Sequence, residues 1–471
     1  MTPPNILWIC TDQQRYDTIH ALGNDRIRTP NIDRLVAAGV SFTQAYCQSP
    51  VCTPSRASFL TGRYPRTTGC RQNGQAMPAH ERLISRLLKD RGYHCGLAGK
   101  LHLASCSDGK VETRIDDGYD DFHWSHHPPP DWPENAYSQW LAKQGKTWNE
   151  LYPPDASPYV RAGVPAEFHQ TTWCAEKACD FMRANTHRPW FFSFNCFDPH
   201  HPFDPPAEYL ARYNAADMPL PRRRDGELHN KPTYQQLDAE WAHNEPDYFH
   251  SGAMTDDDRR RVTAAYYAMV ELIDDQVGRM LRMLDETGQL ENTFFIFMSD
   301  HGEMLGDHGI YMKGPYFYDA AVHVPLIFSW AGRLQENLRV DGLVELVDIV
   351  PTLLDIANVP TPAAIQGRSL LPICTGRADP HHHRDGVFSE YYNAWTHHRS
   401  YGTMWRTADK KIAIYHGIDA GELYDLATDP DEYNNLWDSA DHRDLKDTLI
   451  KQAFDASVFT MSPTPERLGP F

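Results

Sequence analysis

The sequence predicts an α/β fold in which a large, mainly parallel central sheet is flanked by helices and followed by a smaller C-terminal α+β subdomain. First, apolar runs typical of strands buried on both faces alternate with stretches typical of helices, the order that builds a parallel sheet. Second, 471 residues with 41% hydrophobic side chains can bury a large core. Third, the rhythm changes near residue 385, after which short β-like runs precede one helix.

The N-terminal part of the chain supplies the first strands and helices. Residues 5–11 (NILWICT) form a continuous apolar run, which predicts a strand buried on both faces. Residues 29–39 begin near a proline and end at a glycine, as helices prefer, and residues 54–62 begin a second helix. Residues 82–92 show helical spacing and end in glycine, so residues 93–98 become the next strand.

The alternation continues in the middle of the chain. Residues 190–197 (WFFSFNCF) predict another buried strand. Residues 259–287 predict a long amphipathic helix, followed by a strand at 293–298 (TFFIFM) and one more at 324–329 (VPLIFS).

Two stretches, 105–168 and 204–250, lack this alternation and are rich in Pro, Trp, His and charge. We expect insertions over one face of the sheet, where substrate pockets are often built. The predicted division is an α/β domain over residues 1–375 and the α+β subdomain over residues 385–471.

Composition excludes some classes of function. Lys plus Arg is 45 and Asp plus Glu is 63, so the net charge of −18 argues against nucleic-acid binding. Any anion site must therefore be a local basic pocket in an acidic body. No apolar run is long enough to cross a bilayer, and the N-terminus lacks a secretory pattern, so we expect no membrane partner. The ten cysteines include no CxxC pair, which favours reduced thiols and a cytoplasmic location.

Reactive side chains follow four of the predicted strands, at the point where each strand ends. They are Asp12 after the first, Lys100 and His102 after the second, His200 after the third, and Asp300 with His301 after the fourth. Ligands of open α/β sheets bind beyond the carboxyl ends of the strands. We therefore expect one shared site rather than four unrelated loop caps.

Asp12, Asp300 and His301 form a candidate metal site. Carboxylate oxygens favour Ca²⁺ or Mg²⁺, and one imidazole also admits Mn²⁺ or Zn²⁺. Of these ions we expect Ca²⁺, with Mg²⁺ or Mn²⁺ as alternatives.

The segment SPVCTPSRASFLTG places Cys52 at a junction between a loop and a helix. The positive end of the helix dipole lies there, and Pro54 is well placed because its missing N–H costs nothing in the first turn. Taken alone, such a cysteine is either a small buried apolar residue or a reactive thiol with a lowered pKa.

The run C-T-P-S-R, with L-T-G-R after it, resembles the C-x-P-S-R signature of the type I sulfatases, which belong to the alkaline-phosphatase-like superfamily. The resemblance implies that a maturase oxidises Cys52 to formylglycine (3-oxoalanine), whose hydrated form supplies an oxygen nucleophile at the metal. It implies a sulfatase that hydrolyses a small sulfated sugar, aryl or alkyl substrate to an alcohol and inorganic sulfate.

Further motifs extend the resemblance from residue 5 to residue 436. G-K-L-H-L implies that Lys100 and His102 contact the sulfate and the nucleophile, and D-P-H-H-P-F points to His200. S-D-H-G-E implies Asp300 and His301 as metal ligands. Lys313, in M-K-G, matches a lysine that bridges the substrate and the leaving oxygen, and E-L-Y-D-L near the end is typical of the family's C-terminal subdomain.

The resemblance also implies a division of labour. Lys100 and the metal neutralise the sulfate oxygens, and Arg56 supports the nucleophile. His200 or Lys313 protonates the departing alcohol, and His102 accepts the proton when sulfate is expelled.

One position departs from the common sulfatase pattern. Many sulfatases carry two adjacent aspartates on the first strand, whereas here the pair is Asp12 and Gln13. Gln13 can still offer its amide oxygen, so we count Gln13 and Cys52 among the residues at the metal. This pair, with Asn73 as a substrate-binding residue, also resembles the phosphonate monoester hydrolases, a sister group.

Three functions therefore compete. The first is a sulfatase, the second a phosphonate monoester or phosphodiester hydrolase on the same scaffold. The third is a non-catalytic relative that binds sulfated glycans and retains an unconverted Cys52.

Overall fold

The computed structural model describes residues 3–107, 109–127, 132–152, 157–244, 249–393 and 399–461. The strands are β1 (Asn5–Thr11), β2 (Gly39–Phe42), β3 (Ala45–Tyr46), β4 (His94–Gly99), β5 (Asp121–Trp124), β6 (Trp190–Asn195), β7 (Thr293–Ser299), β8 (Leu326–Ser329), β9 (Leu338–Val340), β10 (Val344–Glu345), β11 (Val387–Tyr392), β12 (Tyr401–Arg406), β13 (Lys410–Tyr415) and β14 (Ala420–Asp425). The helices are α1 (Pro30–Ala37), α2 (Cys52–Thr61), α3 (Pro65–Thr68), α4 (Ile84–Lys89), α5 (Ala136–Lys143), α6 (Trp148–Leu151), α7 (Gln170–Ala184), α8 (Ala207–Leu210), α9 (Thr233–Asn244), α10 (Asp256–Glu286), α11 (Asp319–Val322), α12 (Ile349–Ile356), α13 (Leu371–Cys374) and α14 (Arg443–Phe459). Among these described helices, none combines the length and apolarity that a membrane span requires.

The central sheet has eight strands in the order β5-β4-β6-β1-β7-β8-β2-β9. The run from β5 to β7 is parallel throughout, with β1 paired to β6 on one side and to β7 on the other. Strand β8 is antiparallel to both β7 and β2. Because β4, β6, β1 and β7 are parallel, their carboxyl ends meet at one edge of the sheet.

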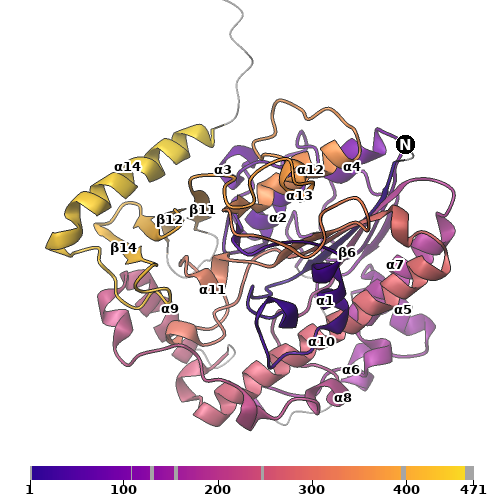
Figure 1. The fold of residues 1–471 in the computed structure, drawn as a ribbon. Coiled ribbons are helices and arrows are strands. Elements are labelled where there is room, and N and C mark those ends of the chain that lie inside the picture. The colour runs from indigo at the N-terminus through magenta and orange to yellow at the C-terminus, as the bar shows by residue number, and fades with distance from the viewer. Residues whose placement is uncertain are drawn as a thin grey trace, which may run out of the picture.

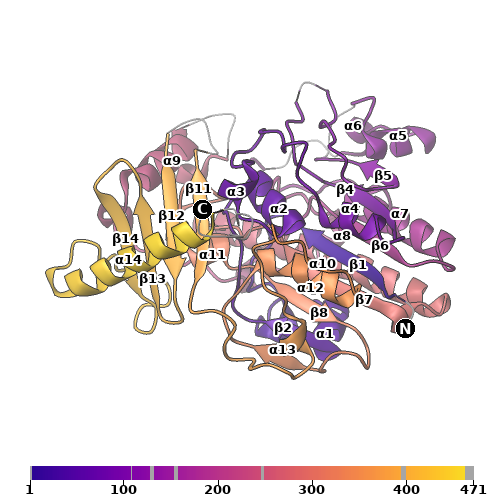
Figure 2. The ribbon, with the colours of Figure 1, turned by 90° about the horizontal axis from the view of Figure 1, so that it is seen from above.

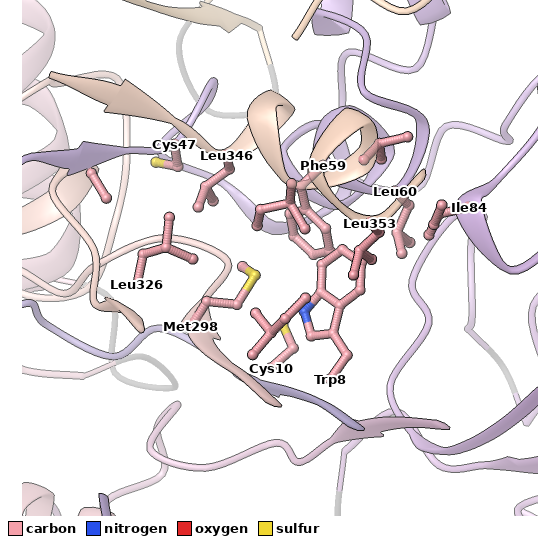
Figure 3. Close-up of a cluster of buried hydrophobic side chains, with 14 of the residues drawn as sticks. Trp8, Cys10, Cys47, Phe59, Leu60, Ile84, Met298, Leu326, Leu346 and Leu353 are labelled. Atoms are coloured by element: carbon pink, nitrogen blue, oxygen red, sulfur yellow. The ribbon is translucent and has the colours of Figure 1, made fainter. Parts of the chain in front are cut away.

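Helices cover both faces of this sheet, with α2, α4 and α12 on one face and α1, α7 and α10 on the other (Figure 1). The alternation of side chains in β1 decides which residue faces which layer. Trp8 packs in the first layer and Leu7 in the second. Figure 3 shows Trp8 among the side chains of the first layer, close to Phe59 of α2 and Leu353 of α12. All seven residues of β1 are buried, as a continuous apolar run predicts.

The C-terminal part forms a separate antiparallel sheet, β11-β12-β13-β14, with α14 across it (Figure 2). Leu449 and Ala453 of α14 pack on Ile412 and Leu423 of this sheet. The sheet also contacts the segment before α11, because the Tyr415 hydroxyl donates to the Pro315 carbonyl at 2.7 Å.

Lys411 Nζ lies 2.7 Å from Asp319 Oδ1, and the backbone N–H of Asp319 donates to Glu432 at 2.7 Å. The C-terminal sheet therefore holds the chain just beyond Lys313.

The predicted fold class is confirmed, and β1 has the predicted bounds. The predicted strands at 93–98, 190–197, 293–298 and 324–329 correspond to β4, β6, β7 and β8. The expected insertion 105–168 contains one strand of the central sheet, β5, at its edge. The division at residues 375 and 385 stays a prediction, and residues 462–471 of the expected subdomain lie outside the described part of the chain.

Candidate active site

The carboxyl ends of four parallel strands bring the predicted residues together. Asp12 follows β1 and its N–H donates to the Asp198 carbonyl, beyond β6, at 3.1 Å. Asp300 follows β7 and its N–H donates to Thr11 at 3.3 Å, while the N–H of Lys100, beyond β4, donates to Asn195 at 2.9 Å. These backbone bonds link neighbouring loops, so the side chains they carry meet at one place.

Asp12, Cys52, Asp300 and His301 form a buried cluster whose donor atoms all lie within 4.8 Å of one another. Cys52 Sγ is 3.1 Å from His301 Nε2 and 3.8 Å from Asp12 Oδ1. His301 Nδ1 lies 2.9 Å from the Gly302 carbonyl, which only accepts, so the hydrogen of the neutral ring sits on Nδ1. Nε2 then keeps its lone pair and can bind a metal.

Two buried cations neutralise the carboxylates of this cluster. Lys100 Nζ hydrogen-bonds to Asp12, and Arg56 Nε donates to Asp300 Oδ2 at 2.9 Å. Burial raises the pKa of Asp12, but the charges of Lys100 and Arg56 oppose burial and hold the pKa well below its usual range. Arg56 Nη1 also donates to the Lys100 carbonyl at 2.9 Å, so one guanidinium ties α2 to the loops after β4 and β7.

Cys52 is the first residue of α2. Burial and Asp12 raise the pKa of its thiol, but Lys100, Lys313 and His301 outweigh them and lower the pKa below its usual value. The position therefore favours an anionic atom. Ser55 Oγ, one turn later, donates to the Asp300 carbonyl at 2.5 Å and fixes α2 against the loop after β7.

A cavity of about 370 Å³ opens over Cys52. Its lining is rich in nitrogen groups and is made by Cys52, Asn73, Lys100, His102, His126, His127, Phe197, His200, His201, Pro202 and Lys313. No carboxylate is among these described lining residues, so the cavity suits an anion. Asn73 Oδ1 accepts from the N–H of Thr53 at 3.0 Å, which leaves its amide N–H groups for a ligand.

A family model described as Sulfatase matches residues 4–359. The chain belongs to the sulfatase family. A second model, described as N-sulphoglucosamine sulphohydrolase, C-terminal, matches residues 306–457, so the two models overlap across the segment that carries Lys313.

Relatives match the sulfatase over nearly its full length. An uncharacterized sulfatase, YidJ, of Escherichia coli strain K12 is 30% identical, and the match covers 97% of this chain and 87% of that protein. An arylsulfatase of Clostridium perfringens is 29% identical over 95% of this chain and 93% of that protein. Among solved structures, a phosphonate monoester hydrolase of Agrobacterium radiobacter has a TM-score of 0.87 at 25% identity, covering 98% of this chain and 97% of that one. The chain is thus a sulfuric ester hydrolase with an alkaline-phosphatase-like fold.

His200 and Lys313 of the sulfatase form a hydrogen-bonded pair. His200 Nδ1 lies 2.6 Å from the His201 carbonyl and must donate to it, which places the lone pair of the neutral ring on Nε2. That atom is 2.7 Å from Lys313 Nζ and accepts a hydrogen bond from it. Burial and the charge of Lys313 lower the pKa of His200 well below its usual value. His200 is therefore a neutral acceptor, and Lys313 carries the proton.

Gln13 has an unusual conformation and two charged partners. Its backbone φ is 68°, and its N–H donates to Asp300 Oδ1 at 3.0 Å. The amide nitrogen donates to Glu303 and the amide oxygen accepts from Lys313. The side chain thus lies beside the cluster with its oxygen toward an ammonium, and its ligation of a metal stays a prediction.

His102 follows Lys100 by two residues, and its backbone has the left-handed conformation with φ of 59°. Burial, with the charges of Lys100 and Arg56, lowers the pKa of its imidazole well below its usual value. His102 is therefore neutral and able to accept a proton.

Five residues that line the cavity are not among the predicted site residues, namely His126, His127, Phe197, His201 and Pro202. His126 and His127 follow the end of β5, so the rule that found the other residues would have found these as well. The signal was weak because β5 has only four residues, three of them only partly buried.

Proposed function

We propose that this sulfatase uses residue 52, converted from cysteine to formylglycine, as its nucleophile, together with one divalent cation, Ca²⁺, held by Asp12, Asp300 and His301. The observation that carries the proposal is the burial of Cys52 in one cluster with two carboxylates and an imidazole, beneath a cavity lined by nitrogen groups. The sulfur atom stands where an oxygen of formylglycine would lie. With that replacement the donor set becomes mainly oxygen, as Ca²⁺ prefers.

The charges around the cluster favour a bound anion. Lys100, Arg56 and Lys313 supply three positive charges beside the two carboxylates of Asp12 and Asp300. A divalent cation among these buried side chains would raise the positive charge further. The cavity would therefore attract a sulfate group despite the net charge of −18 on the whole chain.

Hydrated formylglycine beside a cation would supply a nucleophilic hydroxyl of lowered pKa and a second hydroxyl for release of the product. The residues of the chain do the rest. Lys100, one of the lining residues, binds sulfate oxygens, and Arg56 holds Asp300 and the Lys100 loop in place.

Protons move through two groups on the cavity wall. Lys313, oriented by His200 and Gln13, donates a proton to the leaving oxygen. His102, which is neutral, would accept a proton as sulfate leaves. Asn73 directs its amide N–H groups toward the substrate because Thr53 occupies its oxygen.

The substrate we propose is a small sulfated sugar. A relative named N-acetylglucosamine-6-O-sulfatase, of Bacteroides thetaiotaomicron, is 25% identical over 504 residues, and the second matching family is also named for an amino sugar. A cavity of about 370 Å³ is within the range of small-ligand pockets and leaves room for one sugar ring.

Two measurements test the nucleophile. The chain is coexpressed with a formylglycine-generating maturase, and the peptide that contains residue 52 is examined by mass spectrometry. We expect the aldehyde and its hydrate, together with turnover of sulfated sugars that is absent from Cys52→Ala. A free thiol in active enzyme would contradict the proposal.

A phosphonate monoester hydrolase is the second candidate, favoured by the TM-score of 0.87 to such an enzyme and by Gln13 in place of a second aspartate. Matured enzyme should be assayed in parallel on an aryl sulfate and on an aryl phosphonate monoester with the same leaving group. We expect the larger kcat/KM on the sulfate. A much larger value on the phosphonate would overturn this choice.

A further inference from the structure

A second cluster of metal-binding side chains lies beside the same cavity, apart from Asp12 and Asp300, and two of its members, His102 and His126, line the cavity. His102, Cys106 and His126 each offer one donor atom, and these atoms lie within 4.8 Å of one another. The rings of His102 and His126 meet edge to face, with centroids 4.4 Å apart. Cys106 plays no part in the chemistry proposed above, so its place beside two imidazoles needs another explanation.

A buried carboxylate builds this cluster. Glu112 accepts from the backbone N–H groups of His102 at 2.7 Å, Leu103 at 2.5 Å and Ala104 at 3.2 Å. The same carboxylate accepts from the indole N–H of Trp124, the last residue of β5, at 2.6 Å. Glu112 therefore ties the loop of His102 to the end of β5, and so fixes the spacing between His102 and His126.

Two imidazole nitrogens in this cluster are buried and lack partners. Among the described residues, neither Nδ1 of His102 nor Nε2 of His126 has a hydrogen-bond partner. His126 Nδ1 is already paired with His127 Nδ1 at 2.8 Å, which leaves Nε2 as its remaining nitrogen. Buried polar atoms are nearly always satisfied, so two unpaired nitrogens beside a thiol indicate a missing ligand.

We propose that His102, Cys106 and His126 form a second metal site, selective for a borderline d-block cation such as Zn²⁺ and not for Ca²⁺. One soft thiolate and two borderline imidazoles suit Zn²⁺ or Co²⁺, whereas Ca²⁺ takes oxygen ligands. Three protein ligands leave a fourth position for water or for an anion in the cavity. Burial raises the pKa of the Cys106 thiol to about 12, so the metal displaces the thiol proton, which passes to the buffer.

Occupancy of this site inhibits the enzyme, a consequence that rests on the role proposed for His102 in sulfate release. A lone pair of His102 that binds a metal no longer accepts a proton, and the added cation repels positive charge from that ring. The site thus links turnover to the concentration of free Zn²⁺.

The binding test uses Co²⁺, whose bonds to sulfur give a charge-transfer absorption band. Cys52→Ala is the starting protein, because it removes the thiol of the other cluster and needs no maturation. With excess Ca²⁺ present to fill the site of Asp12, Asp300 and His301, we expect one Co²⁺ per chain. It should give a sulfur-to-cobalt band that Zn²⁺ abolishes. Adding Cys106→Ser should remove the band, and adding His126→Asn should weaken Co²⁺ binding at least tenfold. A protein without the band, or a band that survives Cys106→Ser, overturns the site.

The inhibition test uses matured enzyme saturated with Ca²⁺. Zn²⁺ should inhibit the parent, and Cys106→Ser should raise the half-inhibitory Zn²⁺ concentration at least tenfold with the uninhibited rate unchanged. Equal Zn²⁺ sensitivity of the two proteins overturns the link to catalysis. The Co²⁺ measurement requires no activity, so its result is independent of whether the proposed function holds.

Discussion

Replacement of Lys313 by methionine separates its role as an acid from its role as a charge. The ammonium group carries three protons. One goes to the amide oxygen of Gln13, and another goes to His200 Nε2 at 2.7 Å, so the third is free for the leaving oxygen. Methionine fills a similar volume in this buried place but cannot donate a proton.

The size of the effect depends on the leaving group. General acid catalysis contributes about 10²- to 10⁴-fold, or roughly 2.7–5.5 kcal/mol of barrier. A sugar alkoxide is a poor leaving group and needs this proton, whereas a nitrophenolate does not. We therefore expect Lys313→Met to lower kcat/KM for a sulfated sugar by about 10²- to 10⁴-fold. The loss for 4-nitrophenyl sulfate should be much smaller, because it reflects only the lost charge near the sulfate.

The assay is kcat/KM on a series of sulfate esters whose leaving groups differ in pKa, for parent and variant. His200→Gln is the matched control, because a glutamine oxygen can still accept from Lys313 while the ring is lost. We expect this control to keep most of the activity on every ester. If Lys313→Met lowered kcat/KM by the same factor for every ester, the role of Lys313 as an acid would be refuted. Only its electrostatic role would remain.

Three further outcomes are expected. Arg56→Lys keeps the positive charge but loses one of the two buried hydrogen bonds that Arg56 makes to Asp300 and to the Lys100 carbonyl. Urea unfolding should therefore show a loss of about 1.5–3 kcal/mol in the free energy of unfolding. An unchanged urea midpoint would argue against a role of Arg56 in linking the two loops. Burial raises the pKa of Asp204 from 3.8 to about 8, so the folded state binds this proton more tightly than the unfolded chain does. As pH rises between these values, the free energy of unfolding of the parent should fall relative to that of Asp204→Asn, by up to about 1.4 kcal/mol per pH unit. If the stabilities of the two proteins, measured by thermal unfolding, changed equally from pH 5 to 8, this would be contradicted. Gly99→Ala places a Cβ 1.9 Å from a backbone oxygen, whereas Gly92→Ala meets nothing within 4 Å at a similarly positive φ. Gly99→Ala should therefore cost about 1–3 kcal/mol more in thermal unfolding, and equal losses would rule out the clash.

The sequence was most informative where a local pattern was enough to predict a strand, a helix start or the edge of the sheet. The run NILWICT is buried throughout, and the residues after four parallel strands meet at one edge, as the direction of those strands requires. The Cys52 motif placed its residue at the start of a helix, and the structure puts that residue beside Asp12 and His301.

Other features depend on contacts that no local pattern contains. Strand β5 is short and lies at the sheet edge, so it lacks the apolar run that marked β1. Gln13 hydrogen-bonds to two residues far along the chain, Glu303 about 290 positions away and Lys313 about 300 positions away. The proton on His200 could be assigned to Nδ1 only once the His201 carbonyl was seen 2.6 Å away. Such arrangements follow from packing, which spacing along the chain does not encode.

The burial of α2 has a consequence for biosynthesis. All ten residues of this helix are buried, and the Cys52 side chain is 2% exposed. A modifying enzyme reaches a side chain only while that side chain is exposed, and the folded protein leaves Cys52 almost fully covered. On the proposal that residue 52 becomes formylglycine, its conversion has to come before α2 packs into the core. Under the same proposal, molecules that fold first would keep the thiol, so the active fraction of a preparation would measure how often conversion precedes folding.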